Sequence, residues 1–305
     1  DYLYRTSVLA KNGKIYCAPG QAQKVLEIDP NATRTEDYWK TVGSYENDSD
    51  NINYYTSVLA GNGKIYCPPY NNGKVLEINP ATAITTSQSL TTPTTPTSTT
   101  TLIGDEYRGV NKYATSVLAG NGKIYAAPSN AAQVLEIDPD AGTTTLIGDI
   151  YSDTDKYATS VLARNGKIYA APYGSGATQV LEIDPATSTT RLIGKEVNVY
   201  GNGTDRRYSS SVLGNNGKIY AAPFNAKKVL EIDPLAPRDK DGNDTEPDQP
   251  TIKLIGEEIT GRFKYVTSVL AENGKIYAAP YQADYVLEID PYYTDINKAS
   301  QIIGA

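Results

Sequence analysis

The chain has 305 residues, of which 39% are hydrophobic and 21% charged, a composition typical of a globular protein with a substantial core. Its net charge of −7 argues against a nucleic-acid partner, which requires a basic face, and no apolar run approaches the roughly 20 residues that span a bilayer. The chain has no His, which excludes Ser–His and Cys–His nucleophiles and His-dependent transition-metal sites.

One segment recurs six times along the chain. Its first copy, residues 7–19, reads SVLAKNGKIYCAP, and the tyrosines of its NGKIY motif follow one another at intervals of 44 to 59 residues. These tyrosines are Tyr16, Tyr66, Tyr125, Tyr169, Tyr220 and Tyr277. A repeat of this length is typical of solenoids and propellers.

Each repeat predicts four short strands. In the first copy we expect strands over residues 7–10, 14–18 and 25–29, and in the third copy a fourth strand over residues 145–148. Asn12-Gly13 predicts a tight hairpin, since both residues tolerate a positive φ. Asp29-Pro30 predicts the turn that follows the third strand. No long helical periodicity is present, so each repeat is expected to form a four-stranded antiparallel sheet.

Six such sheets predict an all-β fold, a six-bladed β-propeller in a single domain of residues 1–305. The expected blades are residues 1–50, 51–109, 110–153, 154–204, 205–261 and 262–305. An open solenoid would carry polar capping repeats, but the end repeats here are as apolar as the middle ones. Because the chain starts on a first strand and ends on a last one, we expect no swapped closing strand. Closure is expected from side-chain packing between the first and last blades.

The pattern NGKIYAAP…VLEIDPxTxT resembles a kelch-type repeat. Ala-Ala or Cys-Ala replaces the double glycine of that family, and its usual tryptophan is mostly missing, so the resemblance is to a divergent, kelch-like propeller. It is similar to uncharacterised algal and protist proteins with NGKIY and V-L-x-I-D-P repeats. The resemblance covers nearly the whole chain and implies a fold, not a function.

Sequons and a Thr-rich tract suggest a secreted glycoprotein. The N-glycosylation candidates are Asn31, Asn47, Asn202 and Asn243, all in expected turns or connectors. Residues 85–101 contain ten Thr, three Ser and two Pro, typical of an O-glycosylated, mucin-like loop with candidate sites Thr91, Thr92, Thr94 and Thr95. An unmodified flexible insertion is the alternative for this tract.

One acidic loop resembles the opening of a Ca²⁺ site. Asp239, Asp241 and Asn243 have the alternating spacing of oxygen ligands. However, Asp244 replaces the glycine of such loops and Pro250 replaces their bidentate glutamate, so a solvated acidic loop is favoured. No cofactor is expected, with Ca²⁺ as the alternative.

Two sets of aromatic residues are candidates for a ligand-binding rim. The Tyr that precedes the inner strand is Tyr4, Tyr54, Tyr113, Tyr157, Tyr208 or Tyr265, and the residue after the A-A-P strand includes Tyr70, Tyr173 and Tyr281. If both sets reach one rim they form an aromatic ring suited to sugar faces. The favoured alternative is that each Tyr packs between blades.

The remaining repeated residues are interpreted as structural. Every repeat carries the Lys of NGKIY and the Glu of VLEID, which are expected to pair across adjacent strands. Six equivalent carboxylates do not provide the distinct environment of a catalytic group. Cys17 and Cys67 occupy equivalent positions in neighbouring blades, too far apart for a disulfide, and are expected to be buried free thiols.

These observations favour an extracellular, glycosylated structural or interaction propeller that binds proteins and assembles into an oligomer or filament. A carbohydrate-binding propeller is the main alternative. A Ca²⁺-dependent, lactonase-like hydrolase is a third hypothesis. It is disfavoured because it needs unmatched acidic ligands on the inner strands, which are uniform here, so no enzyme is expected.

Overall fold

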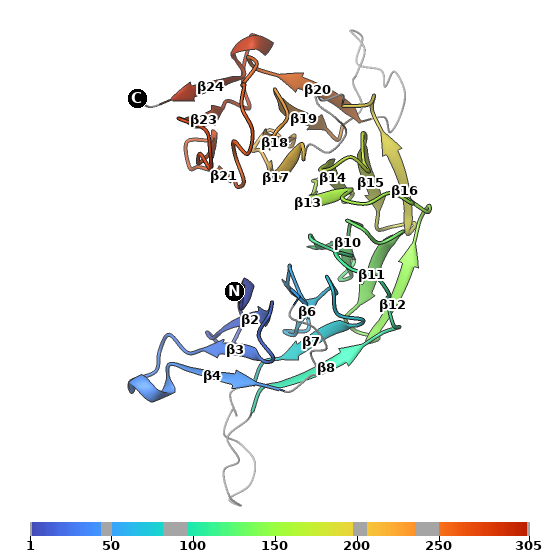
Figure 1. Ribbon diagram of the computed structural model, residues 1–305, viewed down its shortest axis with the longest axis vertical. Coiled ribbons are helices and arrows are strands. Elements are labelled where there is room, and N and C mark those ends of the chain that lie inside the picture. The colour runs from blue at the N-terminus through green and yellow to red at the C-terminus, as the bar shows by residue number, and fades with distance from the viewer. Residues whose placement is uncertain (1, 44–50, 82–96, 198–205, 236–249, 304–305) are drawn as a thin grey trace, which may run out of the picture. The chain divides into compact units, whose positions relative to one another are not determined.

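A computed structural model describes residues 2–43, 51–81, 97–197, 206–235 and 250–303 (Figure 1). The contacts divide the chain into two compact units. Unit 1 consists of Asp1–Leu118, Gly122–Ala126 and Leu135–Leu146. Unit 2 consists of Ala119–Asn121, Ala127–Val134 and Ile147–Ala305.

Six four-stranded antiparallel sheets make up the structure, and each consists of four consecutive strands. The first contains β1 (Tyr4–Leu9), β2 (Ile15–Pro19), β3 (Val25–Ile28) and β4 (Trp39–Val42). The second contains β5 (Val58–Leu59), β6 (Ile65–Cys67), β7 (Val75–Asn79) and β8 (Thr99–Ile103). The third contains β9 (Val117–Leu118), β10 (Ile124–Ala126), β11 (Val134–Asp138) and β12 (Thr143–Ile147).

The other three sheets belong to unit 2. The fourth contains β13 (Tyr157–Leu162), β14 (Ile168–Pro172), β15 (Val180–Asp184) and β16 (Thr189–Ile193). The fifth contains β17 (Tyr208–Leu213), β18 (Ile219–Pro223), β19 (Val229–Asp233) and β20 (Thr251–Ile255). The sixth contains β21 (Val269–Leu270), β22 (Ile276–Ala278), β23 (Val286–Ile289) and β24 (Ser300–Ile303). Single-turn 3₁₀ helices, η1 (Thr35–Asp37) and η2 (Ile296–Lys298), precede β4 and β24.

This architecture confirms the predicted all-β fold with six four-stranded blades and no swapped strand. Closure by packing of the first blade on the last stays a prediction, as does the single domain. The strands differ from expectation mainly at their ends: β1 begins at Tyr4, and β8 begins at Thr99, inside the tract interpreted as a mucin-like loop. This strand reads TTTLI, and its β-branched Thr and Ile residues favour an extended conformation.

The hairpin at Asn12-Gly13 has a different geometry from the one expected. Ala10 N donates to Lys14 O and Gly13 N donates to Ala10 O, which defines a three-residue loop. Only Gly13 has a positive φ, of 80°, as in a type I turn followed by a left-handed residue. The same glycine recurs with positive φ in every copy, as Gly63, Gly122, Gly166, Gly217 and Gly274.

Register places the Tyr of NGKIY opposite the Glu of VLEID in every sheet, as in Tyr16↔Glu27 and Tyr220↔Glu231. The neighbouring Ile residues of the same two strands also oppose each other, as in Ile15↔Ile28. Since side chains alternate between the faces of a strand, one face carries the polar Tyr–Glu pair and the other the Ile–Ile pair.

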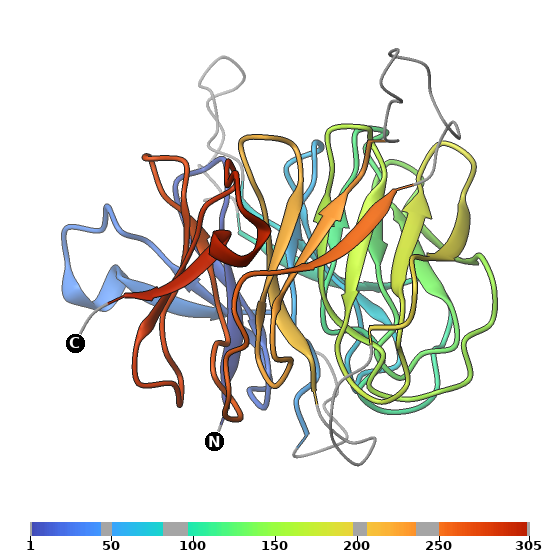
Figure 2. The ribbon, with the colours of Figure 1, turned by 90° about the horizontal axis from the view of Figure 1, so that it is seen from above.

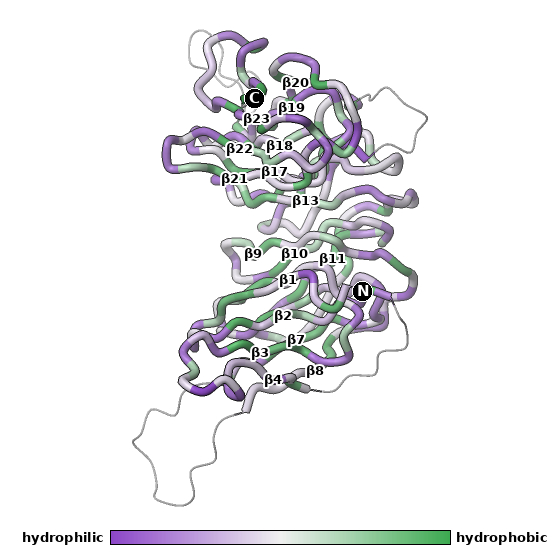
Figure 3. Tube along the Cα trace, turned by 60° about the vertical axis from the view of Figure 1, so that its left-hand side comes forward, coloured by the Kyte–Doolittle hydropathy of each residue, from purple (hydrophilic) through white to green (hydrophobic). Residues whose placement is uncertain are grey.

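The core lies between the faces of neighbouring blades. In unit 1 one cluster joins Tyr16 and Val25 of the first blade to Ile65 and Leu76 of the second. In unit 2 comparable clusters join the fourth blade to the fifth and the fifth to the sixth; β13 and β17 run side by side (Figures 1 and 2). Hydrophobic residues follow the strands and hydrophilic ones the loops (Figure 3). None of the described helical segments has the length and apolarity required to cross a membrane.

Candidate functional site

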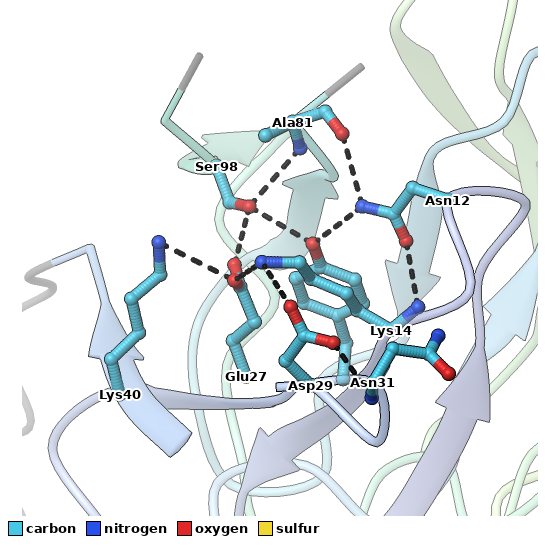
Figure 4. A network of polar contacts seen from close by, with 9 residues as sticks. Asn12, Lys14, Glu27, Asp29, Asn31, Lys40, Ala81 and Ser98 are labelled. Carbon is cyan, nitrogen blue, oxygen red and sulfur yellow. Dashed lines mark hydrogen bonds and ion pairs between the residues drawn. The ribbon is translucent and has the colours of Figure 1, made fainter. Parts of the chain in front are cut away.

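A buried carboxylate organises the polar contacts of the first blade (Figure 4). Glu27 is 2% exposed and lies 2.9 Å from Lys14 Nζ and 3.3 Å from Lys40 Nζ. Ser98 Oγ, which precedes β8, donates to Glu27 Oε2 over 2.6 Å. Burial raises the pKa of Glu27, but hydrogen bonds from Ser98 and Lys14 outweigh it and the net pKa is lowered. Glu27 is therefore held ionised within the frame.

The predicted cross-strand ion pairs form in every blade. Their Nζ–Oε1 distances range from 2.6 Å for Lys123–Glu136 to 3.2 Å for Lys167–Glu182. The other pairs are Lys14–Glu27, Lys64–Glu77, Lys218–Glu231 and Lys275–Glu288. The predicted pairing is therefore confirmed in all six blades, although the further partners of the carboxylate differ, as with Ser98 at Glu27 and Arg191 at Glu182.

An asparagine side chain links one blade to the next. Asn62 Nδ2 donates to Tyr66 Oη and to Pro139 O of the following blade, both over 3.0 Å, and its Oδ1 accepts from Lys64 N. Burial and the nearby Glu77 raise the pKa of Tyr66 to about 12, despite the opposing bond from Asn62. Equivalent bonds join Asn216 to Tyr220 and Pro291. The NGKIY motif thus supplies both a hairpin and a connection between blades.

Buried cations precede the inner-strand tyrosine in four repeats, and sequence reasoning missed them. Lys112, Lys156 and Lys264 are each at most 3% exposed, and Arg207 is 8% exposed. Lys112 Nζ donates to Gly109 O over 2.6 Å and Lys264 Nζ to Gly261 O over 2.9 Å. Desolvation lowers the pKa of each lysine to about 8. These side chains hold the connector between blades. The sequence carries one signal for them, a basic residue directly before four of the six inner-strand tyrosines.

The proposed ring of inner-strand tyrosines requires correction. Five of these side chains are at most 1% exposed, so their rings cannot form a surface platform. They are Tyr54, Tyr113, Tyr157, Tyr208 and Tyr265. Their hydroxyls reach backbone carbonyls inside the blades, as Tyr208 Oη does at Lys228 O over 3.0 Å. Tyr4, Tyr70 and Tyr173 remain partly exposed, and Tyr281 is exposed.

An aromatic–arginine cluster in unit 1 is instead the surface where aromatic residues gather. We define it by Tyr2, Arg5, Tyr55 and Tyr70. The Arg5 guanidinium lies 5.0 Å from the Tyr2 ring centroid and 4.4 Å from that of Tyr55, and donates to Tyr55 Oη over 2.9 Å. The Tyr55 and Tyr70 centroids are 5.0 Å apart. Of the predicted rim residues, only Tyr70 belongs to this cluster. Arg5 and Tyr55 both occupy the repeat position directly after the inner-strand Tyr, which is Ala, Ser or Val in the other four repeats.

A polar groove of about 610 Å³ lies beside the second blade, entirely within unit 1. Its walls come from the loop after β6 and from the connector after β8. The charged or aromatic lining residues are Lys74, Glu106, Tyr107 and Arg108. Its volume is that of a small-molecule site, and none of these four residues was singled out from the sequence.

The glycosylation and calcium candidates fall mostly outside the described residues. Asn31 is exposed in the turn after β3, where its backbone N–H donates to Asp29 Oδ1. Asn47, Asn202, Asn243, the four Thr candidates, Asp239 and Asp241 lie outside the described residues. Within the described part of the chain, no group of three or more His, Cys, Asp or Glu residues is arranged to hold a metal.

Both cysteines are free and buried. Burial raises the pKa of each thiol, most strongly for Cys67, which is fully enclosed. Cys67 packs in the core cluster between the first two blades, and Cys17 opposes Ser7 across β1 and β2. Buried, protonated thiols of this kind are unreactive core residues.

Comparison with solved structures identifies similar folds. A streptogramin B lyase structure has a TM-score of 0.60 at 12% identity, covering 100% of this chain and 84% of that one. A protein from Lactobacillus plantarum has a TM-score of 0.63 at 10% identity, covering 99% and 84%. These identities show the fold alone, a β-propeller.

A third similar structure is an extracellular domain. It is the extracellular domain of a protein described as a hybrid two-component system from B. thetaiotaomicron, with a TM-score of 0.52 at 9% identity. The match covers 100% of this chain and 35% of that one. Neither models of protein families nor curated proteins give a match to the sequence.

Proposed function

We propose that the chain is an extracellular interaction propeller that associates with further copies of itself through the outer edges of its blades. The proposal rests on one observation. Five outer strands expose an apolar side chain at the same repeat position, each between 37% and 48% exposed. These residues are Leu102, Leu146, Leu192, Leu254 and Ile302.

The outer strands are suited to association for a second reason. Each is the last strand of its sheet, so one edge of its backbone is not paired within that sheet. Unpaired edges with apolar side chains are templates for pairing with another chain. The sequons, the Thr-rich tract and the extracellular domain among the similar folds support an extracellular, glycosylated protein. We also propose that the repeats are of the kelch-like type.

Light scattering on protein secreted from a eukaryotic host tests this proposal. We expect concentration-dependent oligomers, which Leu192→Lys weakens because it places a charge on the exposed strand edge. Ala186→Lys, in the exposed turn before the same strand, is the matched control and should associate as the wild type does. A wild-type protein that stays monomeric at high concentration would contradict the proposal. Glycosidase treatment followed by mass spectrometry tests glycan occupancy separately.

Carbohydrate binding is the second candidate function, and the aromatic–arginine cluster favours it. Partly exposed Tyr rings offer flat apolar faces for sugar rings, while the Arg5 guanidinium donates hydrogen bonds. A glycan array tests this candidate: we expect binding that Tyr55→Ala removes and that Tyr281→Ala, at an exposed tyrosine outside the cluster, retains. An array without bound glycans would count against it.

A Ca²⁺-dependent hydrolase is the third proposed function. Its calcium candidates are the three residues Asp239, Asp241 and Asn243. Thermal unfolding with and without Ca²⁺ tests it, because a cation that binds only the folded state raises the unfolding midpoint. An unchanged midpoint at millimolar Ca²⁺ would argue against this hypothesis.

A further inference from the structure

The repeats supply an internal comparison for the groove beside the second blade. One backbone hydrogen bond, about 2.7–2.8 Å long, joins the connector to the preceding loop in four blades. It runs from Tyr107 N to Gly73 O, Tyr151 N to Ala132 O, Val197 N to Thr178 O and Ile259 N to Lys227 O. These residues are therefore structurally equivalent.

The fifth blade has an ion pair at this place. Lys227 Nζ lies 3.3 Å from Glu258 Oε2, and Glu258 directly precedes Ile259. In the second blade the equivalent acidic residue, Glu106, is kept, but Gly73 replaces the lysine. The Glu106 carboxylate lies over this glycine: a Cβ at Gly73 would be 1.9 Å from Glu106 Oε1. The second blade thus has the acid without the lysine.

A groove lies beside Gly73 and the Glu106 carboxylate. The groove of about 610 Å³ is lined by Gly73 and Glu106 together with Asn72, Lys74 and Arg108. Asn72 Oδ1 accepts a hydrogen bond from Lys74 N over 3.0 Å, so the amide nitrogen of Asn72 is the group that can donate to a ligand. The groove therefore combines one carboxylate acceptor with two cationic donors and an amide donor.

An aromatic wall completes the groove. Tyr107 Oη donates to Thr144 Oγ1 over 2.6 Å, which fixes the position of the ring. A held Tyr ring offers an apolar face to a flat or weakly polar ligand surface.

The charges select the ligand. A simple anion would be repelled by Glu106, and a simple cation by Lys74 and Arg108. A ligand with neutral hydroxyl donors and one carboxylate satisfies all three, since the hydroxyls can donate to Glu106 and the carboxylate can accept from Arg108. We propose that this groove binds a hexuronic acid residue of an acidic oligosaccharide.

This arrangement is specific to the second blade among the four compared. At the position of Arg108 the third blade has Ser152, the fourth has Asn198 and the fifth has Thr260, so only the second blade has a basic residue there. The third blade also has Ile150 in place of Glu106, whereas the fourth keeps an acid, Glu196, with Thr178 at the position of Gly73. The proposal takes its ligand class from the carbohydrate-binding candidate, but the groove shares no lining residue with the aromatic–arginine cluster.

Calorimetric titration with trigalacturonic acid, and with its methyl ester as the neutral probe, tests the proposal. We expect the acid to bind and the ester to bind roughly tenfold more weakly or worse, since esterification removes the charge that Arg108 recognises. Gly73→Lys should restore the ion pair of the fifth blade with Glu106, fill the groove and weaken binding roughly tenfold or more. The φ of Gly73 lies outside the left-handed region, and the atoms that a new Cβ would meet are the flexible end of the Glu106 side chain, which can move aside, so the unfolding midpoint should be nearly unchanged.

Matched variants separate the possible outcomes. Ala132→Lys, at the equivalent exposed position of the third blade, should bind as the wild type does. Equal binding of acid and ester, full binding by Gly73→Lys, or binding of a free amino acid in place of the uronate would each overturn the groove proposal. If Tyr55→Ala alone removes binding, the carbohydrate-binding candidate survives and the groove proposal fails; if trigalacturonic acid does not bind, the groove proposal fails alone.

Discussion

Replacing Asn62 with alanine tests whether the repeated asparagine stabilises the junction between blades. The substitution removes three hydrogen bonds, to Tyr66 Oη, Pro139 O and Lys64 N. Tyr66 Oη keeps two acceptors within 3.1 Å for its single hydrogen, Glu77 Oε2 and Pro139 O, so the buried hydroxyl does not lose every partner. At about 1 kcal/mol for each bond, we expect the free energy of unfolding to fall by about 2–3 kcal/mol.

Urea denaturation followed by circular dichroism measures this loss. Asn31→Ala is the matched control in the same unit, because Asn31 is exposed and its hydrogen bond to Asp29 uses its backbone N–H. We expect the control to change stability by less than about 0.5 kcal/mol. Equal losses for the two variants would refute the view that the asparagine links the blades.

Three further predictions concern buried titratable groups. Glu231→Ala should destabilise by about 1–3 kcal/mol in urea denaturation, because the bonds of this buried carboxylate to Lys218 and Tyr293, both over 3.1 Å, are lost while Lys218 keeps Asp233 at 3.2 Å. An unchanged stability would show that the pair is dispensable. Lys264 has a pKa of about 8 in the folded state against 10.5 for the free side chain, so the unfolded chain binds more protons between pH 8 and 10.5 and stability should rise with pH there. Lys264→Met should flatten this rise, and an unchanged slope would refute the assignment. Cys17 and Cys67 should react with a thiol reagent only after unfolding; rapid labelling of the native protein would contradict their burial.

Local patterns in the sequence predicted the elements of each blade. The Asn12-Gly13 dipeptide located the first hairpin, and the short spacing of NGKIY and VLEID, 13 residues from Lys to Glu in five blades and 15 in the fourth, placed Lys14 and Glu27 on adjacent strands. Both inferences need only short-range chemistry and strand alternation. The dipeptide suggested a two-residue turn with a positive φ at both Asn12 and Gly13. In the structure only Gly13 has a positive φ, and the loop therefore has three residues.

The contacts between blades were not predictable in the same way. Asn62 and Pro139 are 77 residues apart, and Ser98 reaches Glu27 across 71 residues, so no local pattern joins them. Burial of Lys112 also depends on how the connector folds over it, although its place before Tyr113 was visible.

The groove was hidden for a related reason. Gly73 reads as an ordinary loop glycine until the backbone bond to Tyr107 aligns it with Lys227 of the fifth blade. The alignment then shows that Glu106 lacks the lysine that pairs with Glu258 in the fifth blade and, unlike the acids of the other compared blades, lies beside an arginine, Arg108. Differences between repeats become informative once the structure defines which residues correspond.

Hydrogen–deuterium exchange with and without saturating trigalacturonic acid tests the central claim, that the repeats build the frame and blade-specific surfaces bind. The account predicts protection in residues 71–74 and 105–109, with no change in the equivalent residues 130–133 and 149–153 of the third blade. Equal protection of the NGKIY strands in all six blades, or no protection of the groove segments, would contradict it.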